Sequence, residues 1–255
     1  MCFWSNPETA KELSDNDPTM SMDLFRRGLR EAIPWVRSVG LAAGGEYLSD
    51  PMLEERLAVL GEALRMHPEV YFEGISNASM LRRETLGFLR RVQRAVFTLS
   101  IDSADALVYA SVRRPGKLFR AEENIRQLRP ALTALGVGFV HMSLNVVLMK
   151  RTLLTLPATI RLAHEIGATV NCDHAQGFGP DLSRESLFGV PVFANLFLER
   201  CERLAKRLGV GFSRPPPFAV TADEIRLARV ERPSSCSQLD EAVAFFILTK
   251  IQALL

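Results

Sequence analysis

Short apolar segments alternate with amphipathic helical segments along most of this chain, and that order constrains the fold more than any other feature. The segments predicted to be strands cover residues 36–43, 70–75, 95–101, 137–148, 168–173 and 209–212. Apolar residues at steps of three and four predict helices at 21–33, 53–67, 80–92, 118–135, 153–163 and 193–208. Strands joined through helices are typical of parallel sheets with right-handed crossovers. The sequence therefore predicts an α/β fold.

Three of the predicted strands carry polar side chains on one face, although strands of a parallel sheet are normally apolar on both faces. These polar stripes are Thr98, Ser100 and Asp102; His141, Ser143 and Asn145; and Thr169, Asn171 and Asp173. Helices on the outer face of a curved sheet would leave the stripes facing inward. We therefore expect a partial (β/α) barrel of parallel strands with outer helices and a polar ligand inside it. The alternatives are an open sheet with a wet face, or polar groups that pair with one another.

The composition fits one large domain and argues against several classes of partner. With 255 residues, 47% of them apolar, the chain can bury a full core. A formal net charge of +2 gives no electrostatic reason to expect a nucleic-acid or membrane-surface partner. Four cysteines at wide, irregular intervals do not form a disulfide framework, so we expect a cytoplasmic setting. The longest apolar block, 242–248, is shorter than the roughly 20 residues that a membrane-spanning helix needs.

Paired glycines and a carboxylate follow the first predicted strand, whose apolar residues we expect to be buried. Gly44 and Gly45 allow a tight turn or a close approach of the backbone to a ligand, and Glu46 comes directly after them. Parallel sheets bind their ligands at the carboxyl ends of their strands. Glu46 is therefore a candidate ligand-binding residue, and a strand-to-helix turn with polar caps is the alternative.

The motifs at the strand ends together resemble a known family, the radical S-adenosylmethionine (SAM) enzymes. Gly44-Gly45-Glu46 matches the GGE motif at the end of that family's second strand. Ser76-Asn77 stands where the third strand usually ends in Thr-Asn-Gly, and Ser100-Ile101-Asp102 is similar to the ending of the fourth. The closest match is the stretch 100–128, with the pattern Tyr109, Arg113, Gly116, Phe119 and Asn124. The resemblance covers about residues 2–218.

Membership of this family would imply a specific pair of cofactors. In such enzymes a partial to full (β/α) barrel holds a 4Fe-4S cluster and SAM at the carboxyl ends of its strands. Three thiolates of a C-x3-C-x2-C motif bind the cluster, and an electron from the cluster cleaves SAM to a 5′-deoxyadenosyl radical. The resemblance further implies an electron donor such as a flavodoxin or a ferredoxin. The substrate is unknown, and a peptide or a small biosynthetic intermediate is the class that we expect.

The resemblance also implies which residues would hold the methionyl end and the ribose of SAM. Glu46 and the carbonyl groups of Gly44 and Gly45 would receive the methionyl ammonium group. Ser76 and Ser100 would hydrogen-bond the ribose or the carboxylate of SAM.

The remaining candidate residues would complete the same site. Asn77 and Asp102 would lie beside the two serines. Arg113, with Arg114 as the alternative, would meet the SAM carboxylate. Asn145 would line the site from the next strand, and residues 171–173, which end in Asp173, would flank the adenine.

The chain departs from the family's pattern at both ends. Cys2 stands at the third cysteine of the cluster motif, and the first strand and the first two cysteines are absent. One thiolate cannot hold the cluster, so we expect the chain as written not to generate the radical. Our hypothesis is that Met1 is an internal methionine of a longer reading frame. We expect residues 1–218 to form the barrel and 219–255 a linker with an apolar helix, where many relatives carry a cysteine-rich auxiliary (SPASM) domain.

Two other functions stay open at this point. One is a truncated, non-catalytic SAM-binding protein or scaffold that lacks the cluster. The other is an unrelated barrel aldolase or isomerase, for which Lys150 alone is weak support because such enzymes need a lysine or a metal at the strand ends.

Overall fold

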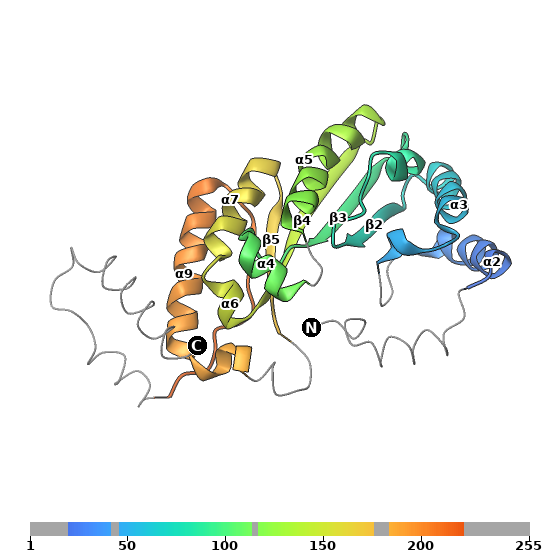
Figure 1. Ribbon diagram of the computed structural model, residues 1–255. Helices are drawn as coiled ribbons and strands as arrows, with labels where there is room; N and C mark the ends of the chain where they lie inside the picture. The colour runs from blue at the N-terminus through green and yellow to red at the C-terminus, as the bar shows by residue number, and fades with distance from the viewer. Residues whose placement is uncertain (1–19, 42–45, 114–116, 176–183, 222–255) are drawn as a thin grey trace.

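The computed structural model describes residues 20–41, 46–113, 117–175 and 184–221 (Figure 1). The helices and 3-10 helices are α2 (Met22–Ala32), η2 (Ile33–Trp35), η3 (Tyr47–Ser49), α3 (Leu53–Met66), η4 (Glu84–Leu89), α4 (Ala106–Val112), α5 (Leu118–Ala134), α6 (Lys150–Leu153), α7 (Leu156–Ile166), η5 (Leu187–Gly189) and α9 (Pro191–Leu208). The strands are β1 (Ser38–Gly40), β2 (Tyr71–Ser76), β3 (Arg94–Ser100), β4 (Phe139–Leu148), β5 (Thr169–His174) and β6 (Phe212–Ser213).

The six strands form one parallel sheet in the order β1-β2-β3-β4-β5-β6. Each strand therefore lies beside its neighbours in the sequence, which is the strand order of a (β/α) barrel. Within the described residues β1 and β6 are the two edges, so the sheet is open. The predicted α/β fold is confirmed, with the strand order of an incomplete barrel.

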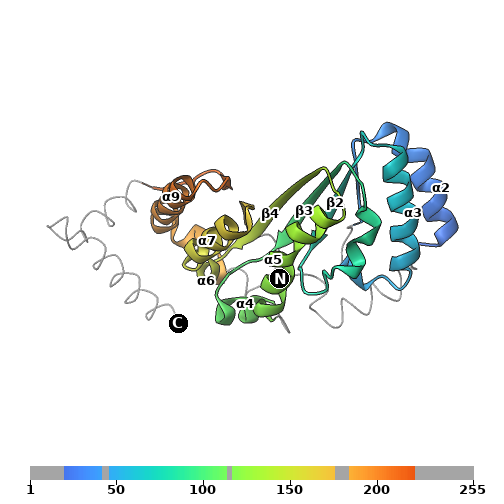
Figure 2. The ribbon, with the colours of Figure 1, turned by 90° about the horizontal axis from the view of Figure 1, so that it is seen from above.

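Helices cover one face of this sheet. Figure 2 shows α4, α5, α6 and α7 on the same side of the strands. The strand residues on that side are buried and join the helix residues in a single hydrophobic core. The largest fully buried side chains include Phe72, Phe97, Leu99 and Met142 from the strands and Leu60, Ile125, Leu128 and Leu132 from the helices.

The opposite face carries the polar stripes. Thr98 lies opposite Ser143, which lies opposite Thr169 on the next strand. One step further toward the carboxyl ends, Ser100, Asn145 and Asn171 line up in the same way. Residues at these alternate positions are mostly half-buried, whereas those between them are buried. The prediction that the polar residues of three strands share one face is confirmed.

Two predicted helix stops are confirmed by backbone conformation. Helix α5 ends just before Gly136, which has φ of 73°, and α7 ends at Gly167, which has φ of 66°. Glycine adopts this left-handed conformation without a steric penalty, and its N–H then bonds to a carbonyl in the last turn.

The prediction of a helix at 80–92 is wrong, because only the 3-10 helix η4 forms there. The Thr85 hydroxyl donates to the Arg82 carbonyl at 2.7 Å and accepts from the Arg82 N–H at 3.3 Å. Such local side-chain bonds offer the backbone an alternative to the helical ladder. Arg91 has φ of 59°, so the segment could not continue as a helix at that residue.

The first strand is shorter and less buried than its composition predicted. Only Ser38–Gly40 pairs with β2, and Val36, Val39 and Leu41 are half-buried. An edge strand has a neighbour on one side alone, which leaves its side chains less covered. Residues 42 and 43, which we expected to extend it, lie outside the described residues.

Gly61 shows how closely α3 packs against η4. A Cβ atom at this position would lie 2.4 Å from the carbonyl oxygen of Phe88, whereas one at Gly28 in α2 would meet nothing within 4 Å. We expect Gly61→Ala to lower the free energy of unfolding by about 1–3 kcal/mol through overpacking. Gly28→Ala should raise it by about 0.5–1 kcal/mol through helix propensity. Urea denaturation of both variants measures the free energy of unfolding. Equal changes in that free energy would contradict the close packing of Gly61 against Phe88.

Candidate functional site

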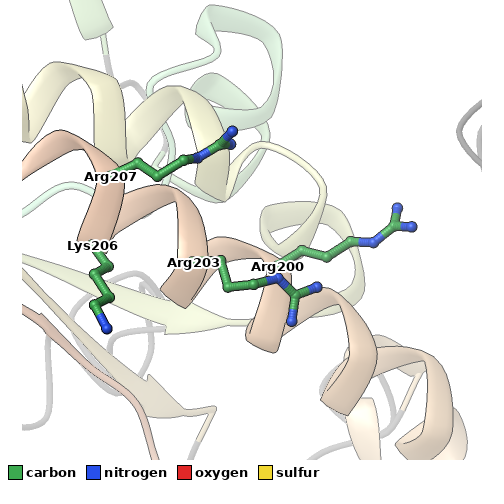
Figure 3. A pocket seen from close by; sticks show the side chains of 4 residues that line it. All are labelled: Arg200, Arg203, Lys206 and Arg207. Carbon is green, nitrogen blue, oxygen red and sulfur yellow. The ribbon is translucent and has the colours of Figure 1, made fainter.

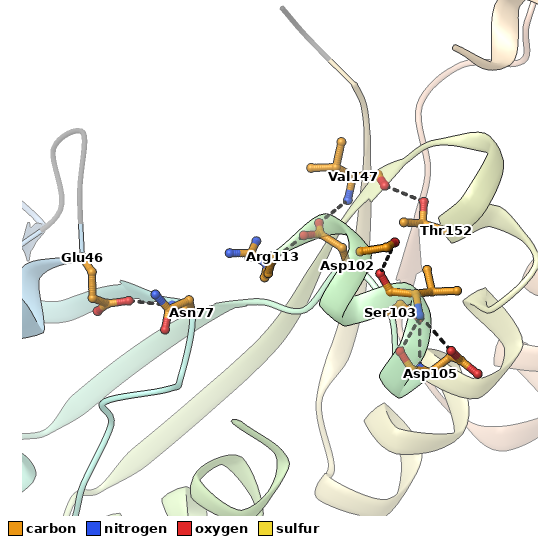
Figure 4. A network of polar contacts seen from close by, with 10 residues as sticks. Glu46, Asn77, Asp102, Ser103, Asp105, Arg113, Val147 and Thr152 are labelled. Atoms are coloured by element: carbon orange, nitrogen blue, oxygen red, sulfur yellow. Dashed lines mark hydrogen bonds and ion pairs between the residues drawn. The ribbon is translucent and has the colours of Figure 1, made fainter. Parts of the chain in front are cut away.

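The carboxyl ends of the strands bring several of the predicted residues to one edge of the sheet (Figure 4). Glu46 lies in the connection after β1, Ser76 is the last residue of β2, and Asn77 follows it. Asp102 lies two residues after the end of β3, and Asn145 is near the end of β4. The strand order places these four strands side by side, so their polar ends form a continuous edge. Gly44, Gly45, Arg114 and Cys2 lie outside the described residues.

The Glu46 carboxylate is fixed by one of its two oxygens. Its Oε2 accepts a hydrogen bond from the Ser76 hydroxyl at 3.1 Å and from the Asn77 N–H at 2.8 Å. Its Oε1 is buried and accepts no hydrogen bond within the described structure. A buried carboxylate oxygen without a donor is unfavourable by roughly 1–3 kcal/mol or more. This oxygen is therefore a place where a ligand with N–H or O–H donors would bind.

Ser76 uses its hydroxyl entirely within the protein. Besides donating to Glu46, the hydroxyl oxygen accepts from the Ala78 N–H at 3.0 Å, and the residue is 2% exposed. The resemblance to radical SAM enzymes implied that Ser76 would bind the ribose or the carboxylate of SAM. These bonds favour a different role, in which Ser76 positions the Glu46 carboxylate.

Asp102 and Arg113 form a second fixed group at this edge. Arg113 Nε donates to Asp102 Oδ2 at 2.8 Å, and the Asp102 side chain is only 4% exposed. Asp102 Oδ1 also accepts from the Val147 N–H at 3.1 Å, which ties the ends of β3 and β4 together. In Figure 4 the terminal nitrogens of Arg113 point away from Asp102, on the side of Glu46 and Asn77. A guanidinium in this position is suited to bind an anionic ligand group.

The polar stripes divide into a paired part and an unpaired part. The Ser143 hydroxyl donates to Thr98 Oγ1 at 3.3 Å, so these two residues satisfy one another. Asn145 Oδ1, one register step closer to the strand ends, is buried and accepts no hydrogen bond within the described structure. Ser100 and Asn171 flank Asn145 in register, and Asp173 on β5 is exposed. Unmet acceptors therefore occur at the carboxyl edge rather than deep in the sheet.

The described cysteines belong to the core. Cys172 on β5 and Cys201 on α9 are free thiols with 4% and 1% exposure. Burial raises the pKa of the Cys172 thiol and raises the pKa of Cys201 to about 12. Within the described residues no group of three or more histidine, cysteine or acidic side chains could hold a metal. Both described thiols therefore belong to the packed interior and lie in no such group.

Sequence reasoning missed the main-chain donors at this edge. The N–H groups of Asn77 and Val147 fix Glu46 and Asp102. Main-chain groups leave no trace in residue identity, so no pattern could have indicated them. The helix α4, capped by the Asp105 carboxylate at the N–H groups of Leu107 and Val108, was also missed, although Asp before an apolar segment is a helix-start signal.

One surface hollow among the described residues shares none of the strand-end residues. It has a volume of about 710 Å³ and is lined by Arg200, Arg203, Lys206 and Arg207 of α9 (Figure 3). It is lined by the long side chains of one helix. We therefore place the candidate site at the strand ends, where the buried unpaired oxygens are.

No protein-family model matches the chain, and no curated protein matches it in sequence. Among solved structures, it is similar to a domain of pyruvate-formate lyase-activating enzyme from Bacteroides vulgatus, with 13% sequence identity and a TM-score of 0.45. The similarity covers 69% of this chain and 96% of that one. None of the described helices has the length and hydropathy of a membrane span.

Proposed function

We propose that this edge binds the amino-carboxylate end of SAM and that the chain is a radical SAM-type protein. The observation that carries the proposal is the Glu46 carboxylate, which has one oxygen held by Ser76 and Asn77 and the other buried and unpaired. A ligand ammonium group would supply the missing donor and balance the charge. Hydrogen bonds between such charged partners are about twice as strong as those between neutral groups.

The surrounding groups suit the rest of the same ligand. Arg113, positioned by Asp102, would bind the ligand carboxylate beside the ammonium group. Asn145 Oδ1 would accept from a ribose hydroxyl or the adenine amino group, with Ser100 and Asn171 as its neighbours in register. The edge thus offers a carboxylate for the ammonium group of SAM, a guanidinium for its carboxylate and neutral acceptors for its nucleoside.

The motif order at the strand ends supports the radical SAM-type assignment. In a form that also holds a 4Fe-4S cluster, bound SAM would be the source of a 5′-deoxyadenosyl radical for the modification of a substrate. An electron donor such as a flavodoxin or a ferredoxin, and a peptide or small biosynthetic substrate, are part of this proposal.

Equilibrium dialysis with labelled SAM tests the proposal, before and after anaerobic reconstitution with iron and sulfide. We expect this chain to bind SAM in both conditions and to form no cluster, since Cys2 alone cannot hold one. If Met1 is internal to a longer reading frame, the chain extended upstream should bind SAM more tightly after reconstitution and show an iron-sulfur absorption spectrum, which would support the radical SAM-type function. SAM binding with no cluster on the extended chain would favour a non-catalytic SAM-binding protein. No SAM binding in either condition would contradict the proposal.

A further inference from the structure

The turn after β2 contains a residue in an unfavourable backbone conformation. Ala78 has φ of 62°, which a non-glycine residue adopts at a cost of roughly 1–2 kcal/mol. Its side chain is fully buried, and its N–H bonds to the Ser76 hydroxyl at 3.0 Å. Strained residues of this kind persist where the surrounding structure holds them, often at functional sites. We therefore expect a contact from outside the turn to hold Ala78 in this conformation.

Asn124, on helix α5, contacts this turn from a distant part of the sequence. Its Nδ2 donates to the Ala78 carbonyl at 2.8 Å and lies 3.4 Å from the Ser79 carbonyl. Asn124 is half-buried, and it is separated from Ala78 by 46 positions. A second bond inside the turn joins the Ser79 N–H to Asn77 Oδ1 at 2.9 Å. Asn124 is thus a side chain outside the turn that holds the strained residue through its carbonyl.

The conformation of Ala78 sets the direction of the Asn77–Ala78 peptide group, whose N–H bonds to the Ser76 hydroxyl and so fixes the turn. That turn presents the Asn77 N–H to Glu46 Oε2 at 2.8 Å and brings the Ser76 hydroxyl to the same oxygen at 3.1 Å. If the turn relaxed, both donors would move away from the carboxylate. Glu46 Oε1 would then no longer be held at a fixed place for a ligand donor.

We propose that Asn124 is a positioning residue, which holds Ala78 in its left-handed conformation and thereby orients the Glu46 carboxylate for its ligand. This inference rests on the proposed SAM site, but the coupling between Asn124 and Ala78 exists whether or not SAM binds. The closing experiment therefore measures the turn and the ligand separately.

The experiment compares Asn124→Ala with Gln127→Ala, which removes an exposed side chain from the same helix. For Asn124→Ala we expect amide hydrogen exchange of residues 77–79 to become faster and SAM affinity to fall by about threefold to tenfold. Gln127→Ala should change neither. Adding Ala78→Gly removes the strain, because glycine adopts a positive φ freely. In the double variant Ala78→Gly with Asn124→Ala, affinity should return to within about twofold of the original chain.

The two measurements distinguish the positioning role of Asn124 from the proposed SAM binding. The chain could bind no SAM while Asn124→Ala still speeds amide exchange at residues 77–79 and Ala78→Gly returns that exchange to its original rate. This result would support the positioning role of Asn124 and contradict SAM as the ligand. A loss of SAM affinity that Ala78→Gly leaves unchanged would contradict the positioning role. Unchanged exchange at 77–79 in Asn124→Ala would also contradict it.

Discussion

Glu46→Ala is expected to weaken SAM binding by about tenfold to a hundredfold. The change removes the acceptor for the ligand ammonium group, and a hydrogen bond to a charged group contributes about 1.5–3 kcal/mol. The fold should survive, because Glu46 lies in the connection after β1 and the Ser76 hydroxyl keeps its bond with the Ala78 N–H. Titration calorimetry with SAM measures the affinity, and the unfolding midpoint in urea reports whether the fold is kept.

Glu54→Ala is the matched control for this change. Glu54 is an exposed acidic residue in the first turn of α3, eight positions further along the chain. Its replacement removes the same charge without touching the strand ends, so SAM affinity should change by less than about twofold. Equal losses of SAM affinity in the two variants would indicate a general electrostatic effect. They would contradict a direct contact between Glu46 and the ligand.

Asp102→Ala is expected to have the largest effect on stability, a loss of about 3 kcal/mol or more in the free energy of unfolding. The side chain is 4% exposed and holds both Arg113 Nε and the Val147 N–H. Removal of the buried Asp102 carboxylate leaves the partly buried Arg113 guanidinium without its counter-charge. The Val147 N–H also loses its acceptor at the point where the ends of β3 and β4 are joined. Urea denaturation, followed by circular dichroism, measures the change.

A comparison with a surface ion pair shows whether burial is the cause. Arg126 and Glu165 are about half exposed, and their side chains lie 2.7 Å apart. Glu165→Ala should lower the free energy of unfolding by less than about 1 kcal/mol, since exposed ion pairs contribute about 0–1 kcal/mol. If Asp102→Ala were as mild as Glu165→Ala, Asp102 would not be the link between the strand ends that its contacts indicate.

Much of the fold could be predicted because it depends on repeating patterns. The alternation of strands and helices predicted a parallel sheet, and polar residues at every second position of three strands predicted their common face. Glycine stops such as Gly136 were predictable because a positive φ favours that residue. The segment 80–92 was not, since the hydroxyl of Thr85 bonds locally and apolar spacing carries no information about such bonds.

The candidate site was predictable in its residue types but less so in its contacts. Glu46 and Asp102 were found from motifs at strand ends, where the structure brings them to one edge. Their partners include the main-chain N–H groups of Asn77 and Val147. Asn124 contacts neither carboxylate; from helix α5 it bonds to the Ala78 carbonyl in the strained turn. The pairing of Ser76 with Glu46 depends on the three-dimensional path of the turn, so its role could not be read from the motif alone.

The most direct test of the central claim is a comparison of two ligands on the unmodified chain. SAM carries the amino-carboxylate end that Glu46 and Arg113 are proposed to bind, whereas 5′-methylthioadenosine keeps the nucleoside and lacks that end. Titration calorimetry with both ligands should show SAM binding at least about tenfold more tightly, as expected from the hydrogen bonds between charged partners. Equal affinity for the two ligands, or no binding of SAM, would contradict the account.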